Sequence, residues 1–113
     1  MRYVKVEGTN IEILNTTSFK KVLEEEFKEG YDTTDYIFDE NLDIRVFIEI
    51  RATHKNLEET ILRKLDNKTV DIFYGTVLFT KCSELSFLSL SKKDINIIQK
   101  RIVNNNGQLE IYY

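Results

Sequence analysis

The sequence predicts a single α+β domain, residues 1–113, with a mainly antiparallel sheet and helices on one face of that sheet. Its 113 residues are the usual length of one domain. Runs of alternating apolar and polar residues are separated by short turns, which is typical of hairpins. Three other stretches carry apolar residues at helical spacing. We expect these elements in the order ββα-ββα-ββα-β, with hairpins and helices alternating along the chain.

The first predicted unit is a hairpin followed by a helix. Residues 2–14 form two short alternating runs joined by a turn that contains glycine. Residues 15–30 predict the helix, with Thr16 or Thr17 as its N-cap and Gly30 as its stop. The apolar residues that we expect on its buried side are Phe19, Val22, Leu23 and Phe27.

The second predicted unit contains the clearest strand. Residues 35–38 and 42–50 read as a hairpin, followed by a helix over residues 56–67 that starts at a capping box of Asn56 and Glu59. Residues 42–50 place apolar side chains on one face and mostly charged ones on the other, so one face of this sheet should be buried and the other solvated, with helices on one side only. The inward strand residues are Leu42, Ile44, Val46, Ile48 and Ile50, and the inward helix residues are Leu57, Ile61 and Leu65.

The third predicted unit repeats the pattern and is followed by a last strand. Residues 69–81 are apolar on both faces, which predicts a central strand, and Gly75 marks a bulge within it. Residues 84–90 pair back as its hairpin partner. Residues 91–102 predict a helix opened by a second capping box, and residues 108–113 end the chain as a strand. That strand either seals an edge of its own sheet or pairs with a second copy of the chain.

Residues 74–95 contain a strand with Gly-Thr, a turn, and a Phe-x-Ser-Leu-Ser segment that opens a helix with an acid in its first turn. The residues of this pattern are Gly75, Thr76, Phe79, Phe87, Ser89, Leu90, Ser91 and Asp94. With this pattern, the segment resembles a family of small phage- and plasmid-borne domains of unknown function. The resemblance implies a mobile-element origin and no particular activity.

Composition excludes several classes of protein. The net charge of −3 and the pI of about 5.2 argue against a general nucleic-acid binder, which needs cations to neutralise phosphates. The single cysteine, Cys82, allows no internal disulfide, so we expect a cytoplasmic protein, in the host cell if phage-encoded. The first ten residues carry no apolar signal segment, and no run of residues reaches the length of a membrane span.

The most informative feature of the sequence is its acidic middle. Residues 24–43 hold nine acidic residues and one lysine, while the rest of the chain holds ten acids and fifteen bases. Aromatic residues of the kinds found at interface hot spots lie between the acids. The stretch therefore predicts either a solvated charged surface or a surface that binds a basic partner. The predicted partner-binding residues are Glu24, Glu25, Glu26, Glu29, Tyr31, Asp32, Asp35, Tyr36, Asp39 and Glu40.

The sequence offers little catalytic or metal-binding chemistry. His54 is the only histidine and lacks a nucleophile or carboxylate partner in the sequence, and Cys82 has only Lys81 as a neighbouring cation. The carboxylates of residues 32–43 do not have the spacing of a calcium loop. We therefore expect no enzyme activity, no cofactor and no metal site.

Three functional hypotheses follow. The first is a non-enzymatic inhibitor whose acidic patch, as a nucleic-acid mimic, occupies a basic surface of a host-defence protein, such as a nuclease or the effector of a CRISPR system. The second is a sponge that holds a nucleotide signal between protomers, with aromatic rings for stacking and cations for phosphate. Its candidate residues are Tyr74, Lys92, Lys93, Arg101, Tyr112 and Tyr113. The third is an immunity protein that neutralises a nuclease toxin.

Overall fold

The fold is built from two antiparallel sheets and two helices. A computed structural model of the chain describes residues 1–8, 10–34, 44–49, 59–63, 68–83 and 86–103. The helices are α1 (Phe19–Glu26) and α2 (Lys92–Arg101). The strands are β1 (Arg2–Glu7), β2 (Asn10–Asn15), β3 (Tyr31–Thr34), β4 (Ile44–Glu49), β5 (Glu59–Arg63), β6 (Val70–Tyr74), β7 (Thr76–Cys82), β8 (Phe87–Leu88) and β9 (Ile102–Val103).

The larger sheet has six strands and is centred on β7. Its strand order is β2-β1-β7-β4-β3, and β8 also pairs with β7. Every strand pairing among the described residues is antiparallel, which confirms the predicted class. Val77, Leu78 and Phe79 are consecutive and all buried, because both faces of β7 are covered. The prediction of a central strand is thus confirmed for β7.

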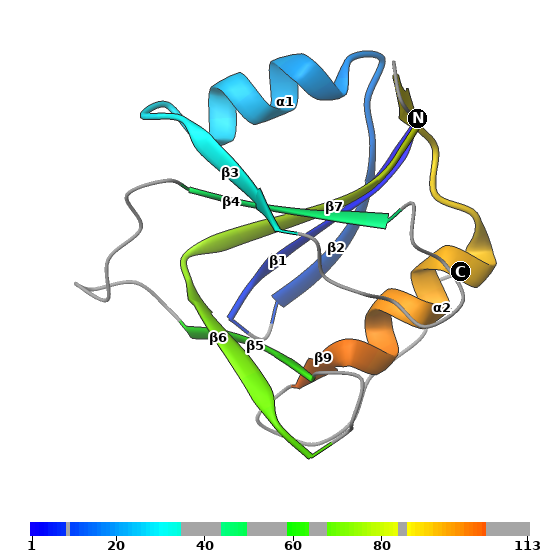
Figure 1. Cartoon of the computed structure of the whole chain (residues 1–113). Helices are drawn as coiled ribbons and strands as arrows, with labels where there is room; N and C mark the ends of the chain where they lie inside the picture. Colours follow the sequence, from blue (N-terminus) through cyan, green and yellow to red (C-terminus); the bar gives the residue numbers. More distant parts are fainter. Residues whose placement is uncertain (9, 35–43, 50–58, 64–67, 84–85, 104–113) are drawn as a thin grey trace.

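Gly75 does not form a bulge within one strand, as predicted for residues 69–81. It separates two strands, β6 and β7. Its φ of 87° lies in the left-handed region that favours glycine. The chain turns there from β6, an edge strand of the three-stranded sheet β6-β5-β9, into β7 of the larger sheet. Figure 1 shows this change of direction between the two sheets.

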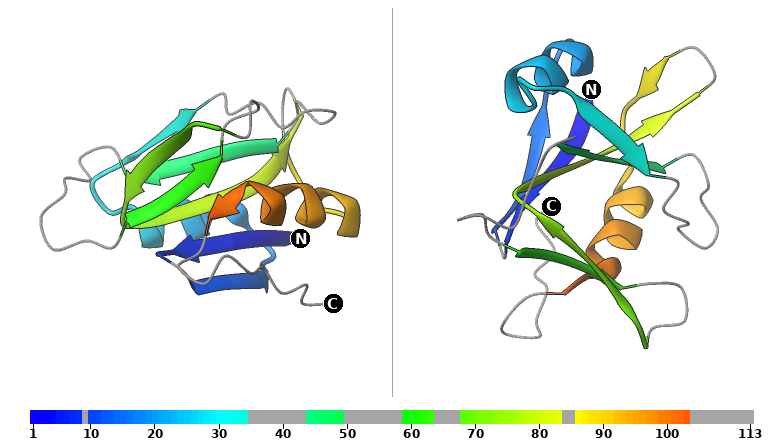
Figure 2. Two further views of the ribbon diagram at one scale, coloured as in Figure 1. Left: turned by 90° about the horizontal axis from the view of Figure 1, so that it is seen from below. Right: turned by 60° about the vertical axis from the view of Figure 1, so that its left-hand side comes forward.

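The two helices lie on opposite faces of the larger sheet, so the prediction of helices on one face is wrong (Figures 1 and 2). Successive residues of a strand point to opposite faces. On β1, Tyr3 packs with α1 whereas Val4 packs with α2, and Phe47 and Val46 of β4 divide in the same way. The face of β4 that the sequence predicted to be wet is covered at Phe47, which is 2% exposed.

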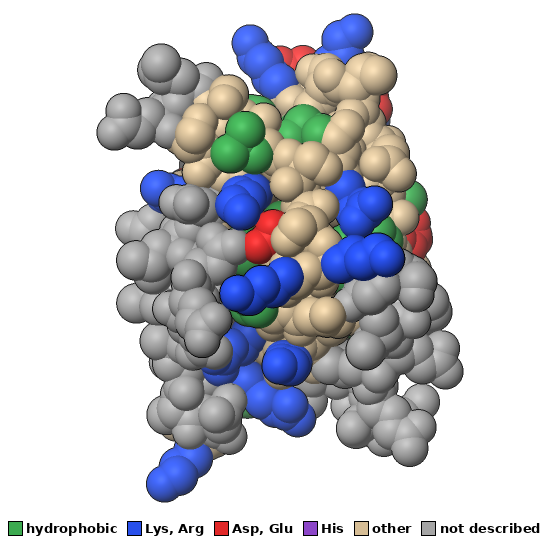
Figure 3. Space-filling model, turned by 90° about the vertical axis from the view of Figure 1, so that its right-hand side faces the viewer, with side chains coloured by type: hydrophobic (Ala, Val, Ile, Leu, Met, Phe, Trp, Pro, Cys, Tyr) green, Lys and Arg blue, Asp and Glu red, His purple; other side chains and the backbone are tan. Residues whose placement is uncertain are grey.

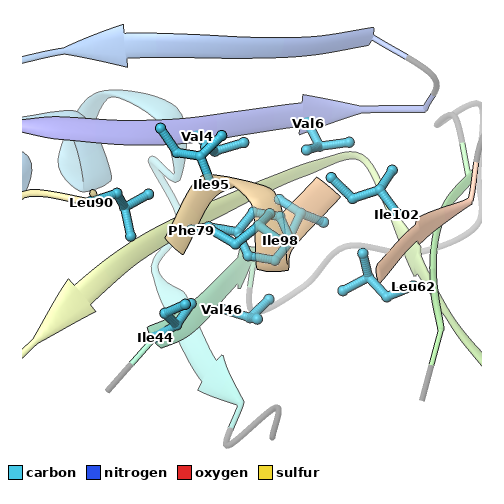
Figure 4. Close-up of a cluster of buried hydrophobic side chains, with 11 residues drawn as sticks. Val4, Val6, Ile44, Val46, Leu62, Phe79, Leu90, Ile95, Ile98 and Ile102 are labelled. Carbon is cyan, nitrogen blue, oxygen red and sulfur yellow. The ribbon is translucent and has the colours of Figure 1, made fainter. Parts of the chain in front are cut away.

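The main core lies between α2 and the larger sheet and extends to the smaller one (Figure 4). Ile95, Ile98 and Ile102 pack against strand residues of both sheets. The buried members of this cluster are Val4, Val6, Ile44, Val46, Leu62, Val77, Phe79, Leu90, Ile95, Ile98 and Ile102. A second cluster of buried hydrophobic side chains lies under α1. In it, Phe19, Leu23 and Phe27 pack against Tyr3, Phe47 and Leu78 of the larger sheet.

The prediction of a helix over residues 56–67 is wrong for residues 59–63, the part of the segment that the structure describes. Residues 59–63 form β5, which pairs with β6 on one side and β9 on the other. Thr60 and Leu62 are buried, so the burial alternates along the segment as in a strand, and Ile61 is only partly buried. Pairing with two distant strands overrides the helical spacing of the apolar residues. Among the described residues, the order is therefore ββα followed by six strands, a second helix and a strand.

Helix α1 is shorter than the predicted helix of residues 15–30, because it begins at Phe19 and ends at Glu26, with Phe27 rather than Gly30 at its C-cap. The hairpin of β1 and β2 is confirmed, and Ser18, rather than Thr16 or Thr17, caps α1 through a 3.4 Å hydrogen bond from the Lys21 amide. On the side away from β7, β4 pairs with β3, which ends before the predicted strand of residues 35–38. Residues 35–43 and the predicted terminal strand lie outside the described residues. Neither helix in the described part of the chain is long and apolar enough to cross a membrane.

The second capping box is confirmed and fixes the start of α2. The Ser91 hydroxyl accepts a 3.1 Å hydrogen bond from the Asp94 amide, and the Asp94 carboxylate accepts a 2.8 Å hydrogen bond from the Ser91 amide. Lys81 lies 3.5 Å from the same carboxylate. Asp94 is buried, so these donors compensate for the water that its carboxylate loses on folding.

Candidate functional site

Carboxylates from three segments gather around Lys5 on the side of the larger sheet that carries α1. Lys5 lies on β1, and its Nζ atom is 2.6 Å from Oε1 of Glu26 at the end of α1. Glu12 of β2 is directly opposite Lys5 in the hairpin register. Glu7 lies two residues farther along β1, so it points to the same face of the sheet. The fold thus brings together acids that are far apart in the sequence.

The electrostatic effects on two neighbouring side chains agree with this arrangement. The hydrogen bond from Lys5 to Glu26 raises the pKa of Lys5, as do the charges of Glu26, Glu12 and Glu7, whereas burial opposes the rise. The pKa of Tyr3 is raised by burial first and then by Glu26, Glu12 and Glu25, against the opposing effect of Lys5. We define the acidic face as Glu7, Glu12, Glu25 and Glu26.

Helix α1 presents its acids because its other side is buried. Phe19 and Leu23 dock the helix on the sheet, which leaves Glu24 and Glu25 exposed. Glu24, Glu25 and Glu26 are the last three residues of α1, and the helix dipole disfavours negative charge at that end. Local helix stability therefore does not explain why three carboxylates occupy these positions.

The structure places about half of the predicted partner-binding residues. Glu24, Glu25, Glu29, Tyr31 and Asp32 are exposed, and Glu26 is half-buried against Lys5. The other predicted residues, Asp35, Tyr36, Asp39 and Glu40, lie outside the described residues.

Sequence reasoning missed Glu7 and Glu12, because neither belongs to the acidic stretch of residues 24–43. The register of the predicted first hairpin was the available signal, since it sets Lys5 opposite Glu12. No sequence signal indicated that Glu26 at the end of α1 would reach the same lysine.

The described residues among those predicted to bind a nucleotide lie at the two ends of α2 and at the end of β6. Lys92 and Lys93 are exposed at the start of α2. Arg101 is at the other end of that helix, about 14 Å away along its axis at the usual rise per residue, and is 4% exposed. Tyr74 is half-buried at the end of β6, and Tyr112 and Tyr113 lie outside the described residues.

The side of the molecule that carries α2 is nevertheless rich in cations. Figure 3 shows Lys and Arg side chains spread over this face, with few acidic ones between them. Lys92, Lys93 and Lys100 are its exposed cations on α2, and Arg63 donates a 3.5 Å hydrogen bond to the Lys100 carbonyl. The charge asymmetry of the sequence is therefore also an asymmetry between two sides of the fold.

Cys82 is partly buried at the end of β7, and His54 lies outside the described residues. Within the described ranges, no three or more His, Cys, Asp or Glu side chains are grouped so that they could hold a metal ion.

Comparison of the chain with protein-family models, with curated proteins and with solved structures gives no significant match. The resemblance of residues 74–95 to phage- and plasmid-borne domains therefore stays a prediction.

Proposed function

We propose that this protein is a small, non-enzymatic inhibitor whose acidic face docks on a basic, nucleic-acid-handling surface of a larger protein. The observation that carries the proposal is the convergence of acids from β1, β2 and α1 around Lys5. Glu24 and Glu29 add further exposed carboxylates at the end of α1 and just after it. A field of this sign attracts a basic partner, and it directs the partner to one side of the molecule.

The cost of the arrangement also supports the proposal. Like charges that are crowded together repel one another, and acids at the end of α1 oppose the helix dipole. Lys5 relieves only part of this repulsion, since at least three carboxylates raise its pKa. Side chains that are unfavourable in the free protein are expected where they gain a favourable contact in a complex.

The class of partner is proposed from the resemblance of residues 74–95 to mobile-element domains. Such elements meet host-defence nucleases, including CRISPR effectors, and these proteins carry basic grooves for nucleic acid. A surface that presents spaced negative charges competes with phosphates for those grooves.

The experiment compares capture by three forms of the tagged protein from one bacterial lysate: wild type, Glu25→Lys and Glu59→Lys. Both substitutions change the net charge equally at exposed positions, but Glu25 lies on the acidic face and Glu59 on β5. We expect a nucleic-acid-binding protein to be retained by wild type and by Glu59→Lys, and to be lost from Glu25→Lys. Capture should also fail at 1 M salt, where screening acts over about 3 Å.

The captured protein then allows a direct test of inhibition. Its binding to a labelled DNA or RNA duplex should fall as wild-type protein is added and should be unaffected by Glu25→Lys. Equal capture by all three forms, or capture without competition for nucleic acid, would contradict the proposal.

A further inference from the structure

A second candidate site lies beside α1, on the same face of the larger sheet. It is an open groove of about 430 Å³ at the ends of β3, β4, β7 and β8. Its described lining residues are Tyr31, Thr33, Arg45, Phe47, Cys82, Ser83 and Phe87. The volume is within the range of pockets that hold small ligands.

The strand register explains why these residues share one face. Thr33 of β3 is directly opposite Phe47 of β4, and Tyr31 and Arg45 each lie two residues from one of that pair. Phe87 of β8 is opposite Cys82 of β7. Strand residues two apart point to the same side, so four strands contribute side chains to one depression.

Aromatic rings form the walls of the groove and are held from below. The ring centroids of Tyr31 and Phe47 are 5.7 Å apart, and those of Phe47 and Phe87 are 6.0 Å apart. The buried ring of Phe19 on α1 packs against both Phe47 and Phe87, with centroid distances of 5.4 Å to Phe47 and 5.1 Å to Phe87. Tyr31 is 41% exposed, so its ring remains available to a ligand. Rings fixed in this way lose little freedom when another ring packs on them.

The polar groups of the groove complement an anion. Arg45 is exposed and is the one charged residue of the seven described lining residues. Thr33 and Ser83 add hydroxyl groups that donate or accept hydrogen bonds. A guanidinium group binds phosphate oxygens with paired donors, and aromatic rings stack on nucleobases of any sequence.

We propose that this groove binds a mononucleotide, with the base packed against Tyr31 and Phe87 and the phosphate held by Arg45. The aromatic rings of the groove match the base of a nucleotide, and the exposed guanidinium group and the two hydroxyl groups match its phosphate. The groove shares no residue with the nucleotide site that the sequence predicted. It also shares no residue with the acidic face.

The test measures binding of AMP, adenosine and inorganic phosphate to the full chain by ligand-observed NMR. We expect AMP to bind more tightly than adenosine, and adenosine more tightly than phosphate. Tyr31→Ala should weaken AMP binding about 5- to 150-fold, the range expected for loss of one stacking ring. Arg45→Met should weaken AMP binding but leave adenosine binding unchanged, because only AMP carries the phosphate.

Two controls keep the result specific. Leu88→Ala changes a residue that is exposed like Tyr31, next to Phe87 but outside the groove lining, and should leave AMP binding unchanged. Glu25→Lys should also leave it unchanged, so failure of the acidic face and failure of the groove are distinguishable. Circular dichroism checks that each variant is folded. No AMP binding at millimolar concentration, or equal AMP binding by folded Tyr31→Ala and wild type, would overturn the proposal.

Discussion

Replacing Thr60 by valine tests the strand that the sequence did not predict. The Thr60 hydroxyl accepts a 3.0 Å hydrogen bond from the Gly8 amide and donates a 3.1 Å hydrogen bond to the Gly75 carbonyl. Thr60 is 0% exposed, and both glycines are buried with positive φ angles. One side chain on β5 therefore joins the turn of the first hairpin to the bend between the two sheets.

The expected cost follows from these two hydrogen bonds. Valine keeps the branched shape but leaves one buried N–H and one buried C=O without the hydroxyl, at about 1–3 kcal/mol each. Burial of the additional methyl group offsets about 0.8 kcal/mol. We therefore expect Thr60→Val to lower the free energy of unfolding by about 1–5 kcal/mol, a substantial part of the ~5–15 kcal/mol of a typical domain.

Urea unfolding followed by circular dichroism measures this effect. At a slope of ~2 kcal/mol per molar urea, the midpoint should fall by about 0.5–2.5 M. Thr60→Ser is the matched control, because it keeps the hydroxyl and removes only a methyl group, and its midpoint should lie closer to wild type. If Thr60→Val is as stable as Thr60→Ser, the proposed bridging role of the hydroxyl is refuted.

Three further predictions concern charge and capping. Ser91→Ala removes the cap of α2 and should lower the free energy of unfolding by about 1 kcal/mol in the same urea assay. Burial raises the pKa of Asp94, but hydrogen bonds from Ser91 and the charge of Lys81 outweigh it, so the net pKa is lowered. The resulting stabilisation is present above the unfolded pKa of about 3.9 and is lost as pH falls through the folded pKa. Stability measured from pH 7 to pH 2 should thus fall less steeply for Asp94→Asn than for wild type, and parallel curves would contradict this. Lys5→Met leaves the acidic face uncompensated, so its melting temperature should fall at low salt and partly recover at 0.5 M salt; a decrease that is independent of salt would show that packing, not charge, is responsible.

The elements predicted from the sequence are those with local signals. The glycine turn after β1 and the capping box of Ser91 and Asp94 lie within the segments that they organise, and both are confirmed. Residues 59–63 lie within a segment whose apolar residues have helical spacing, but their partners β6 and β9 come later in the chain. A local pattern does not show pairing between distant segments. This pairing made residues 59–63 a strand instead of a helix.

The face on which each helix docks was equally hidden in the sequence. The apolar alternation of β4 was predicted, with Ile44 and Val46 inward, and both are buried. The burial of Phe47 depends on α1 crossing the other face, and Phe19 is the α1 residue that contacts its ring. The acidic face was likewise predicted only in part. Its acids on α1 were predicted, whereas Glu7 and Glu12 join them only through the register of the hairpin and the docking of the helix.

The measurement that tests the central claim most directly is salt-dependent partner binding by Glu12→Gln. Glu12 lies outside the acidic stretch of the sequence and joins the acidic face only through the fold. If that face binds the basic partner captured by wild type, Glu12→Gln and Glu25→Gln should both weaken binding several-fold at low salt, and the difference from wild type should disappear at high salt. The control Glu59→Gln should bind as wild type does. Wild-type affinity of Glu12→Gln together with loss in Glu25→Gln would show that the acidic segment, not the assembled face, is recognised, and wild-type affinity of both would contradict the account.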